Sequence, residues 1–357
     1  MVFSSINFLL IFFPIFFTCY YLTPNKYKNY TLLLGSLAFY FIGTINAPYH
    51  FVLLIACMLV DFVVGLGISR SKKHKKLLLV VGIVFHLICL CTFKYAGFVI
   101  SELNRLSESF NFTANIILPI GISFYTFQGI AYLIDVYRED IEAEESLLCY
   151  CVYISMFEQL IAGPIVTYGQ VQYDLHKRNI WFEDALKGLG IFIFGLGLKV
   201  LLANPLGKLW AQALAIGFES VSTPLAWMSI AAYSFQLYFD FFGYSLMAIG
   251  MGKMLGFDLP INFNHPYTSL TMTEFWRRWH ITLGSWFREY VYIPLGGSRR
   301  SVPRVILNLL IVGLLTGIWH GAGYNFILWG FMLFCILVIE KFFIGKYLNA
   351  HPLIGHI

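Results

Sequence analysis

Long apolar runs separated by short polar loops dominate this sequence. Nearly charge-free runs lie at residues 6–22, 46–68, 77–93, 189–203 and 305–319. Each is about as long as a helix needs to be to cross the ~30 Å hydrocarbon core of a bilayer. Because backbone groups in lipid must form hydrogen bonds within their own element, we expect these runs to be helices. With the usual window of about 20 residues we expect about ten membrane segments, near residues 6–22, 30–43, 47–68, 77–98, 117–136, 147–163, 188–204, 224–251, 303–319 and 324–345.

Residues 264–294 form a further long segment that is amphipathic and aromatic rather than uniformly apolar. We expect this segment to lie partly in the membrane interface or to re-enter the membrane. No internal repeat is visible in the sequence. The pattern therefore predicts one all-α, polytopic transmembrane domain over residues 1–357 and no separate soluble domain.

Composition supports a membrane protein, and the placement of charge predicts its orientation. Hydrophobic residues make up 59% of the chain and charged residues only 12%, whereas soluble domains carry about 25% charged residues. The net charge of +5 does not indicate nucleic-acid binding, because much of it lies in one short run, Arg70–Lys76. Such a run beside a span usually faces the cytoplasm. Lys26 and Lys28 fall on the same side if the first three spans are correct, so the N-terminus is predicted to lie outside.

Six polar residues interrupt the apolar runs and suggest a polar interior. They are Asp61, Asp135, Glu158, Lys199, Gln236 and Asp240. Ionisable groups at membrane depth are costly, so they tend to face a bundle interior or a wet cavity. A packing or interface role is the simpler interpretation for any single one, but their number favours at least one internal polar cavity.

The densest polar region begins with a helix-start signal at Thr271 and Glu274, which have capping-box spacing. Glu274 lies three and four residues before Arg277 and Arg278, so it can neutralise one of these arginines. The loop Ser298–Arg304 is basic and is again a cytoplasmic signal. Its arginines are most simply topogenic charges, although arginine side chains also suit the phosphates of an acyl donor.

The helix that is expected to begin here carries four residues on one face: Trp276, His280, Leu283 and Phe287. An aromatic face of this kind is more often packing than a ligand site. On spacing alone, His280 is equally well an interfacial histidine bonded to a neighbour or a functional residue.

The next span runs from Pro303 to Trp319 and is followed by His320, Gly321 and Gly323. Proline suits the first turn of a helix. A rise of 1.5 Å per residue places His320 about 25 Å along the helix axis from the basic loop, deep in the membrane. Histidine is the side chain best suited to proton transfer near neutral pH. A structural histidine and a general base acting on a hydroxyl are both consistent with this position.

Two motifs in this region closely resemble the membrane-bound O-acyltransferase family. They are FWRRWHITLGSWFREYVYIPLGGSRR at 275–300 and LLTGIWHGAGYNFILWG at 314–330. Further similar segments follow in the family's order and cover almost the whole chain: MVFSSINFLLIFFPIFF at the start, LPIGISFYTFQGIAYLIDVYR at 118–138, QLIAGPIV at 159–166 and YSFQLYFDFFGYSLMAIG at 233–250. The bacterial branch that they resemble includes alginate O-acetyltransferase and the D-alanyl transferase of teichoic acids.

The resemblance implies a fold in which a ring of tilted helices surrounds a thin, funnel-shaped centre. It implies that His320 is the family's catalytic histidine and that His280 is its second active-site histidine. It also implies that Trp279, Arg288 and Trp319 line or brace the reaction tunnel. No metal is implied, because no cluster of ligand residues accompanies these positions.

The chain departs from the family pattern at several positions. Glu158 stands where a proline often occurs, and Phe242 and Leu246 replace a serine and an aspartate. Relatives usually continue for further spans, so the sequence is expected to lack C-terminal spans. A fragment of a longer protein and a shortened, inactive member are both consistent with this. None of these departures touches His280 or His320.

The sequence therefore predicts a multi-pass enzyme of the bacterial cytoplasmic (inner) membrane that transfers an acyl group to a hydroxyl. The expected donor is an acyl-coenzyme A, most simply acetyl-coenzyme A, and no bound cofactor is expected. By resemblance, the acceptor is an exported polysaccharide, or an extracytoplasmic SGNH or esterase-like partner protein that hands the acyl group on. Two alternatives remain: a D-alanyl transferase of the same family, and a transporter that uses the same polar residues. Transporters often carry internal repeats and paired broken helices, and neither is visible here.

Overall fold

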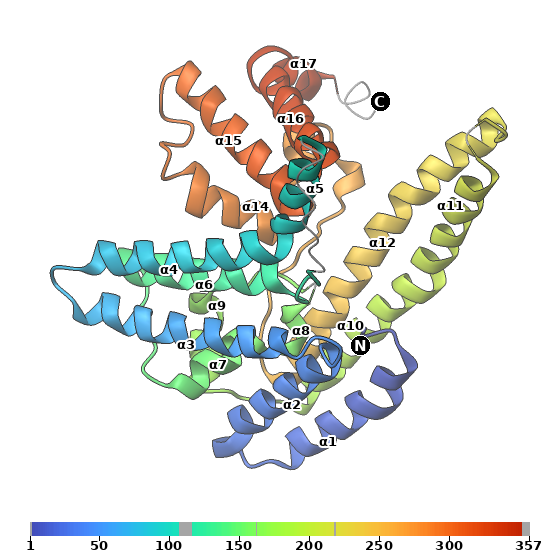
Figure 1. Cartoon of the computed structure of the whole chain (residues 1–357). Coiled ribbons are helices and arrows are strands. Elements are labelled where there is room, and N and C mark those ends of the chain that lie inside the picture. The colour runs from blue at the N-terminus through green and yellow to red at the C-terminus, as the bar shows by residue number, and fades with distance from the viewer. Residues whose placement is uncertain (1, 107–115, 162, 218, 352–357) are drawn as a thin grey trace. The chain divides into compact units, whose positions relative to one another are not determined.

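The regular elements of this protein are helices (Figure 1). The computed structural model describes residues 2–106, 116–161, 163–217 and 219–351. The chain divides into two compact units, one formed by residues 1–43 and 151–261 and the other by residues 44–150 and 262–357. The predicted all-α class is therefore confirmed for the described part of the chain.

The first unit combines the N-terminal helices with the middle of the chain. Its helices are η1 (Phe8–Phe12), α1 (Phe13–Leu22), η2 (Asn25–Tyr27), α2 (Lys28–Gly43), α8 (Phe157–Leu160), α9 (Tyr168–His176), α10 (Phe182–Gly197), η4 (Leu198–Ala203), α11 (Asn204–Ile216) and α12 (Thr223–Leu255). Helix α7 (Leu147–Ser155) crosses the boundary between the two units.

Small residues bring α10 and α12 of this unit into backbone contact. A Cβ atom at Gly188 would lie 2.5 Å from the carbonyl oxygen of Gly250, and one at Gly195 would lie 2.5 Å from that of Gly243. On each helix the two glycines are seven residues apart and share one face. Small residues at such positions let membrane helices pack closely where a hydrophobic driving force is weak.

The second unit contains every residue that the sequence marks as a candidate for catalysis. Its helices are α3 (Tyr49–Arg70), α4 (Lys75–Leu90), η3 (Cys91–Tyr95), α5 (Ala96–Leu106), α6 (Ile122–Arg138), η5 (Pro266–Thr268), α13 (Met272–Arg278), α14 (Ile281–Phe287), η6 (Arg288–Tyr292), α15 (Val302–His320), α16 (Tyr324–Ile339), η7 (Glu340–Ile344) and α17 (Gly345–Ala350).

Five helical stretches among the described residues are long and apolar enough to cross a membrane. They are Tyr49–Arg70, Lys75–Leu106, Phe182–Ile216, Val302–His320 and Tyr324–Leu348. The multi-pass character is confirmed, but the expected count of about ten spans is not reached by this criterion. The expected span at 147–163 is wrong, because α7 ends at Ser155 after 9 residues, a length of only about 13 Å.

Some of the polar residues predicted inside apolar segments have partners within their own unit. The Asp61 carboxylate and the His86 imidazole lie 2.6 Å apart between α3 and α4, and both side chains are almost fully buried. Lys199 and Asp240 form an ion pair of 2.7 Å between η4 and α12. These pairs reduce the cost of holding charge at membrane depth.

Candidate functional site

Helix α15 ends at His320, as the sequence predicts. Pro303 lies in its first turn, and the chain leaves the helix at Gly321 with an extended backbone. The 19 residues of α15 correspond to about 28 Å of rise. His320 therefore lies almost a full membrane thickness from the basic loop Ser298–Arg304.

The His320 ring is held by its own helix. Its Nδ1 atom lies 2.7 Å from the carbonyl oxygen of Thr316, one turn earlier. A carbonyl oxygen only accepts hydrogen bonds, so Nδ1 must carry the proton and donate it. In the neutral ring, Nε2 then keeps its lone pair and can accept a proton. The helix geometry thus selects the tautomer that a general base needs.

Two neighbouring side chains from another helix cap the end of α15. The Lys94 ammonium donates to the carbonyl oxygen of Trp319 and, at 3.1 Å, to the hydroxyl of Ser123. The Tyr95 hydroxyl donates to the carbonyl oxygen of Ile318 at 2.6 Å. The last carbonyls of a helix lack partners within it, and a cation favours this end. Sequence reasoning missed Lys94, whose one signal is a lysine between apolar segments in FKYAGF.

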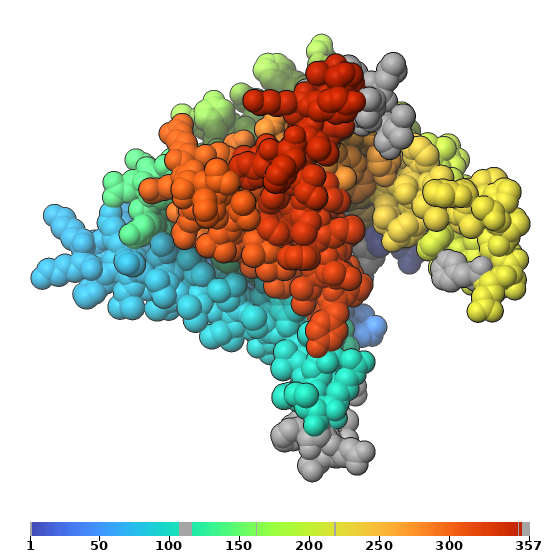
Figure 2. All heavy atoms as spheres, turned by 90° about the horizontal axis from the view of Figure 1, so that it is seen from above, coloured from blue at the N-terminus to red at the C-terminus, as the bar shows by residue number. Residues whose placement is uncertain are grey.

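Helix α15 is also fixed by close contact with α16. A Cβ atom at Gly317 would lie 2.4 Å from the carbonyl oxygen of Phe326, and one at Gly313 would lie 2.9 Å from that of Gly330. The start of α16 in turn rests on α5, as Figure 2 shows in orange-red and teal. There the Tyr324 hydroxyl donates to the Glu102 carboxylate at 3.1 Å. Helix α16, which packs against the helix that carries His320, is therefore itself fixed by α5.

The predicted single helix through His280 is wrong, because the chain breaks there into α13 and α14. His280 has a left-handed backbone, with φ of 45°, which is uncommon for residues other than glycine. Asn262 holds the break: its carbonyl oxygen accepts from the Ile281 N–H at 3.0 Å, and its side-chain oxygen accepts from the Thr282 hydroxyl at 2.7 Å. Such a backbone persists only where surrounding contacts fix it, and it is often found at functional sites.

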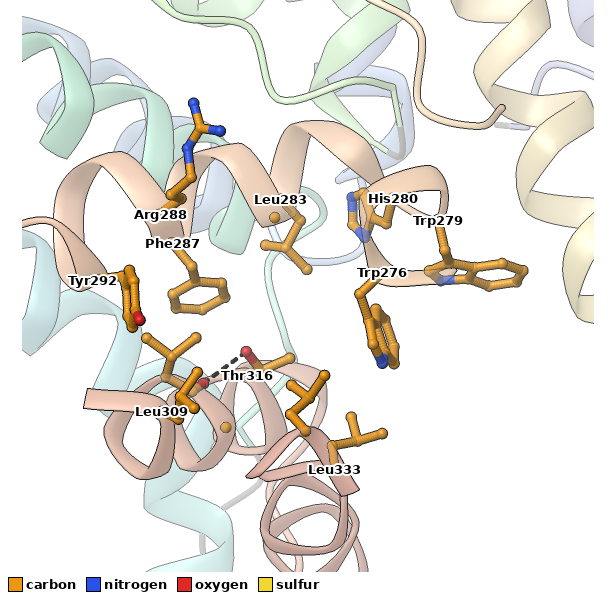
Figure 3. A pocket seen from close by; sticks show the side chains of 14 residues that line it. Trp276, Trp279, His280, Leu283, Phe287, Arg288, Tyr292, Leu309, Thr316 and Leu333 are labelled. Carbon is orange, nitrogen blue, oxygen red and sulfur yellow. Dashed lines mark hydrogen bonds between the residues drawn. The ribbon is translucent and has the colours of Figure 1, made fainter. Parts of the chain in front are cut away.

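An apolar cavity of about 220 Å³ lies beneath this broken helix. The four residues predicted to share one face, Trp276, His280, Leu283 and Phe287, all line it, so the break preserves the expected face. Figure 3 shows Leu283 and Phe287 pointing toward α15. The opposite wall includes Thr316, the residue whose carbonyl holds His320. The cavity therefore lies between the segment of His280 and the last turns of α15.

Both histidines lie against the Trp319 ring. The ring centroids of His280 and Trp319 are 5.8 Å apart, and those of Trp319 and His320 are 4.8 Å apart. His320 also lies 4.8 Å from the Trp329 ring. Burial, with His320 as a second cause, lowers the pKa of His280 to about 3. His280 is therefore neutral near pH 7.

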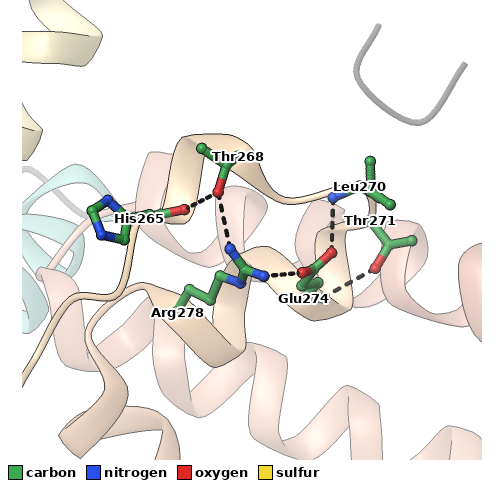
Figure 4. A network of polar contacts seen from close by, with 6 residues as sticks. All are labelled: His265, Thr268, Leu270, Thr271, Glu274 and Arg278. Atoms are coloured by element: carbon green, nitrogen blue, oxygen red, sulfur yellow. Dashed lines mark hydrogen bonds and ion pairs between the residues drawn. The ribbon is translucent and has the colours of Figure 1, made fainter. Parts of the chain in front are cut away.

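Glu274 pairs with Arg278 and helps to begin α13 (Figure 4). Its carboxylate lies 2.5 Å from the Arg278 guanidinium and accepts from the Leu270 N–H at 2.8 Å. The Thr271 side chain accepts from the Glu274 N–H at 3.1 Å, which confirms the Thr271 half of the predicted capping box. The reciprocal bond differs, because the Glu274 side chain accepts from the N–H of Leu270 and not from that of Thr271. Arg278 also donates to the Thr268 hydroxyl at 2.9 Å. The spacing argument thus identified both the helix start and a paired arginine.

Glu340 completes the start of α13 and was not identified from the sequence. This buried side chain accepts from the Met272 N–H at 2.6 Å and from the Thr273 N–H at 3.1 Å. A carboxylate at a helix N-terminus satisfies free N–H groups and complements the helix dipole. Its only signal in the sequence is a single acidic residue after a long apolar run.

A second, polar cavity of about 560 Å³ adjoins the apolar one. The two share Trp276, Gly284 and Arg288 among their lining residues. Arg277, Arg288 and Lys341 bring three cations to the second cavity, and its lining contains no carboxylate. Arg288 also forms an exposed ion pair with Glu289 at 2.8 Å. Arg277, the arginine that Glu274 leaves unpaired, therefore faces a basic cavity.

The other predicted residues occupy distinct places in this unit. Trp279 lines the apolar cavity and stacks on Phe275, with ring centroids 5.5 Å apart. Trp319 lies between the two histidines, as described above. The basic loop Ser298–Arg304 contributes none of the residues that line either cavity.

Comparison with known proteins shows the family to which this chain is similar. Residues 137–350 match the family model described as MBOAT, membrane-bound O-acyltransferase family. The chain is 41% identical over 349 residues to the "Probable alginate O-acetylase AlgI" of Pseudomonas aeruginosa. The aligned residues cover 96% of this chain and 66% of that protein. The chain is 37% identical to the "Peptidoglycan O-acetyltransferase" of Helicobacter pylori, covering 93% of this chain and 69% of that protein.

A more distant similarity extends to another activity. The "Teichoic acid D-alanyltransferase" of Bacillus subtilis is 29% identical over 245 residues, covering 64% of this chain and 60% of that protein. The chain thus spans 60% to 69% of the length of these three curated relatives.

Proposed function

Because the chain belongs to the membrane-bound O-acyltransferase family, we propose that it transfers an acyl group from a thioester to a hydroxyl, with His320 as general base. The hydroxyl oxygen attacks the thioester carbonyl while its proton passes to His320 Nε2. The carbon–sulfur bond then breaks, and the thiolate takes the proton back from the imidazolium. Both protonation states of the histidine are used once in each cycle, so the base is regenerated.

The orientation of the His320 ring is the observation that carries this proposal. The Thr316 carbonyl fixes the proton on Nδ1 and leaves Nε2 as the acceptor. His320 is an exposed residue at a helix end, and Thr316, which holds its ring, lines the apolar cavity. A purely structural histidine would not require an exposed position at this helix end.

The two cavities support a donor of the acyl-coenzyme A type. The apolar cavity suits an acyl chain or pantetheine arm, and the adjoining cations suit phosphate groups. Arginine guanidinium groups bind phosphate through paired hydrogen bonds, and Arg277 and Arg288 both line the basic cavity. Acetyl-coenzyme A is the donor that we propose, on the cytoplasmic side where basic loops are expected.

Two indole N–H groups, one on the cavity wall and one on the ring that contacts both histidines, support the binding of a thioester carbonyl. Among the described residues, Trp276 Nε1 and Trp319 Nε1 are buried and lack a hydrogen-bond partner. A buried donor without an acceptor is unfavourable by about 1–3 kcal/mol. A carbonyl oxygen placed between His280 and His320 would satisfy such a donor. His280, neutral near pH 7, would orient the same group.

The proposed setting is the bacterial cytoplasmic membrane, in the family's arrangement of tilted helices around a thin, funnel-shaped centre. The acceptor that we propose is an exported polysaccharide, or an extracytoplasmic SGNH or esterase-like partner that passes acetyl onward. The alginate and peptidoglycan enzymes among the relatives support an acetylated polysaccharide. A D-alanyl transfer is the second candidate, which the more distant teichoic acid relative supports.

Replacing His320 tests the proposal directly. His320→Gln keeps hydrogen bonding and much of the side-chain volume but cannot accept a proton near pH 7. General-base catalysis typically contributes 10²–10⁴-fold, so transfer should fall by about that factor. The assay follows labelled acetyl from acetyl-coenzyme A in membranes that contain the full set of partners. His280→Ala should also impair transfer, because a positioning group is only partly replaced by water.

His74→Gln is the matched control, because His74 is an exposed histidine in the loop before α4. Its transfer rate should equal that of the wild type. Wild-type activity in His320→Gln at matched protein level would reject His320 as the base. Absence of transfer by the wild type with every acyl donor would contradict the proposed activity itself.

A further inference from the structure

A polar pocket of about 540 Å³ lies in the first unit, and none of its lining residues belongs to the proposed active site. It is formed by the turn after α1, the first residues of α2, and the end of α9 with the loop that follows. Four cations line it, together with three asparagine amides and no carboxylate: Lys26, Lys28, Lys177 and Arg178 with Asn25, Asn29 and Asn179. Such a lining offers positive charge and hydrogen-bond donors to one ligand.

The Arg178 guanidinium is fixed in place by neutral groups. It donates to the Tyr20 hydroxyl at 2.6 Å, to the Asn29 side-chain oxygen, and to the Asp174 carbonyl oxygen at 3.1 Å. Its centre also lies 4.2 Å from the Phe257 ring. These contacts orient the side chain without neutralising its charge. The Glu158 and Asp174 carboxylates lie within electrostatic reach of Arg178, but neither lines the pocket.

Lys28 adds a second cation, for which the described residues provide no carboxylate partner. It is buried, with 9% of its surface exposed, and its ammonium lies 5.0 Å from the Tyr20 ring. Burial, with Arg178 as a second cause, lowers the pKa of Lys28. Among the residues that the structure describes, Lys26, Lys28 and Lys177 form no ion pair with a carboxylate. Like charges that face one pocket repel each other unless an anion joins them.

We propose that this pocket is a binding site for a phosphate group, supplied by the headgroup of an anionic phospholipid. Arginine and lysine side chains are the usual protein partners of phosphate, through charge-assisted hydrogen bonds. The asparagine amides can donate to the remaining phosphate oxygens. A phosphate bound here would relieve the repulsion between Lys28 and Arg178.

The position of the pocket along the chain favours a lipid as the source of the phosphate. The turn that carries Lys26 follows directly on the apolar helix α1, which ends at Leu22. Basic residues beside an apolar helix lie at headgroup depth, where anionic lipids attract them by about 1 kcal/mol per residue. A soluble phosphate compound carries the same phosphate group but is not held at the membrane surface. An experiment can therefore distinguish a lipid headgroup from a soluble phosphate as the ligand.

Thermal unfolding of the purified full chain in detergent tests the site without any acyl-transfer assay. Mixed micelles with dioleoylphosphatidylglycerol are compared with dioleoylphosphatidylcholine micelles and with inorganic phosphate alone. A ligand that binds only the folded state raises Tm. We expect phosphatidylglycerol to raise Tm on the order of 2–4 °C more than phosphatidylcholine does.

The pocket variant is Lys26→Gln with Lys177→Gln, because both lysines are exposed and their loss should not unfold the chain. Its matched control is Lys72→Gln with Lys73→Gln, which removes the same charge from an exposed loop of the other unit. The pocket variant should lose the phosphatidylglycerol effect, and the control should keep it.

An equal lipid effect in both variants would overturn the proposal, because it would report the overall charge of the chain rather than this pocket. The same holds if neither phosphatidylglycerol nor phosphate changes Tm of the wild type. A rise with inorganic phosphate alone, lost in the pocket variant, would keep the phosphate site but reject the lipid source. The failure of this test leaves the proposed acyl transfer untouched.

Discussion

Lys94→Met removes the charged donor at the end of α15 while keeping an unbranched side chain of similar length. The lost contact is the hydrogen bond from the ammonium to the Trp319 carbonyl, the residue before His320. A hydrogen bond that involves a charged group contributes about 1.5–3 kcal/mol. About 1.4 kcal/mol corresponds to a factor of ten. The fraction of molecules in which His320 is correctly placed, and with it the turnover number, should therefore fall about 10–150-fold.

The neighbouring Tyr95 gives a graded comparison at the same helix end. Tyr95→Phe removes only a neutral hydrogen bond to the Ile318 carbonyl, a change of about 0.5–1.5 kcal/mol. Turnover should therefore fall only about 2–10-fold. The matched lysine control is Lys75→Met, at the start of the same continuous helix, where the lysine pairs with an exposed Glu139. An exposed pair of this kind contributes about 0–1 kcal/mol, so turnover should not change.

The assay is acetyl transfer in membranes at matched protein level, with kcat and KM for the donor determined separately. Because Lys94 holds the helix end that carries the proposed base and lines neither of the two cavities proposed to bind the donor, the loss should appear in kcat while KM stays constant. Lys94→Met with normal kcat would refute the capping role. A raised KM with unchanged kcat would instead assign Lys94 to donor binding.

Three further outcomes are expected from contacts in the same structure. Gly317→Ala puts a Cβ atom 2.4 Å from a carbonyl oxygen of α16 and should lower Tm, whereas Gly190→Ala meets nothing within 4 Å and should be tolerated. Glu274→Gln leaves its arginine with a weaker partner and should reduce folded yield; unchanged yield and Tm in detergent would show the pair to be too exposed to matter. Cysteines at Ser71 and Ser301 in a cysteine-free background should react with an impermeant thiol reagent only in opened cells. Their labelling in intact cells would contradict the cytoplasmic assignment of both basic loops.

Local signals in the sequence were sufficient to predict the ends of α15 and the start of α13. Pro303 and Gly321 mark the two ends of one helix, and Thr271 caps the other. These residues act on the backbone within one or two turns, so their effect does not depend on distant packing. The same local logic predicted the ion pair of Glu274 with one of two adjacent arginines.

The contacts that complete the site could not be predicted in this way, because they join residues far apart in the sequence. Lys94 reaches a carbonyl 225 positions away, and Glu340 caps a helix 68 positions away. The break at His280 likewise depends on Asn262, which lies outside the helical pattern. Hydrophobic periodicity predicts which face of a helix a residue lies on, but it does not predict which distant residue contacts that face. The aromatic face was therefore predicted correctly, and the continuous helix was not.

The orientation of His320 by its own helix depends on where α15 ends and on the glycine that follows it. Many catalytic histidines are oriented by a carboxylate on another element, but here the partner is the Thr316 carbonyl one turn back. The ring therefore keeps its orientation only if α15 remains helical to its last residue and stops there. Gly321 leaves the helix with an extended backbone that any residue could adopt, yet a Cβ atom there would lie 2.2 Å from the Phe326 ring. Close approach of α16 is thus what requires glycine, and the same approach holds the end of α15 that presents His320 Nε2.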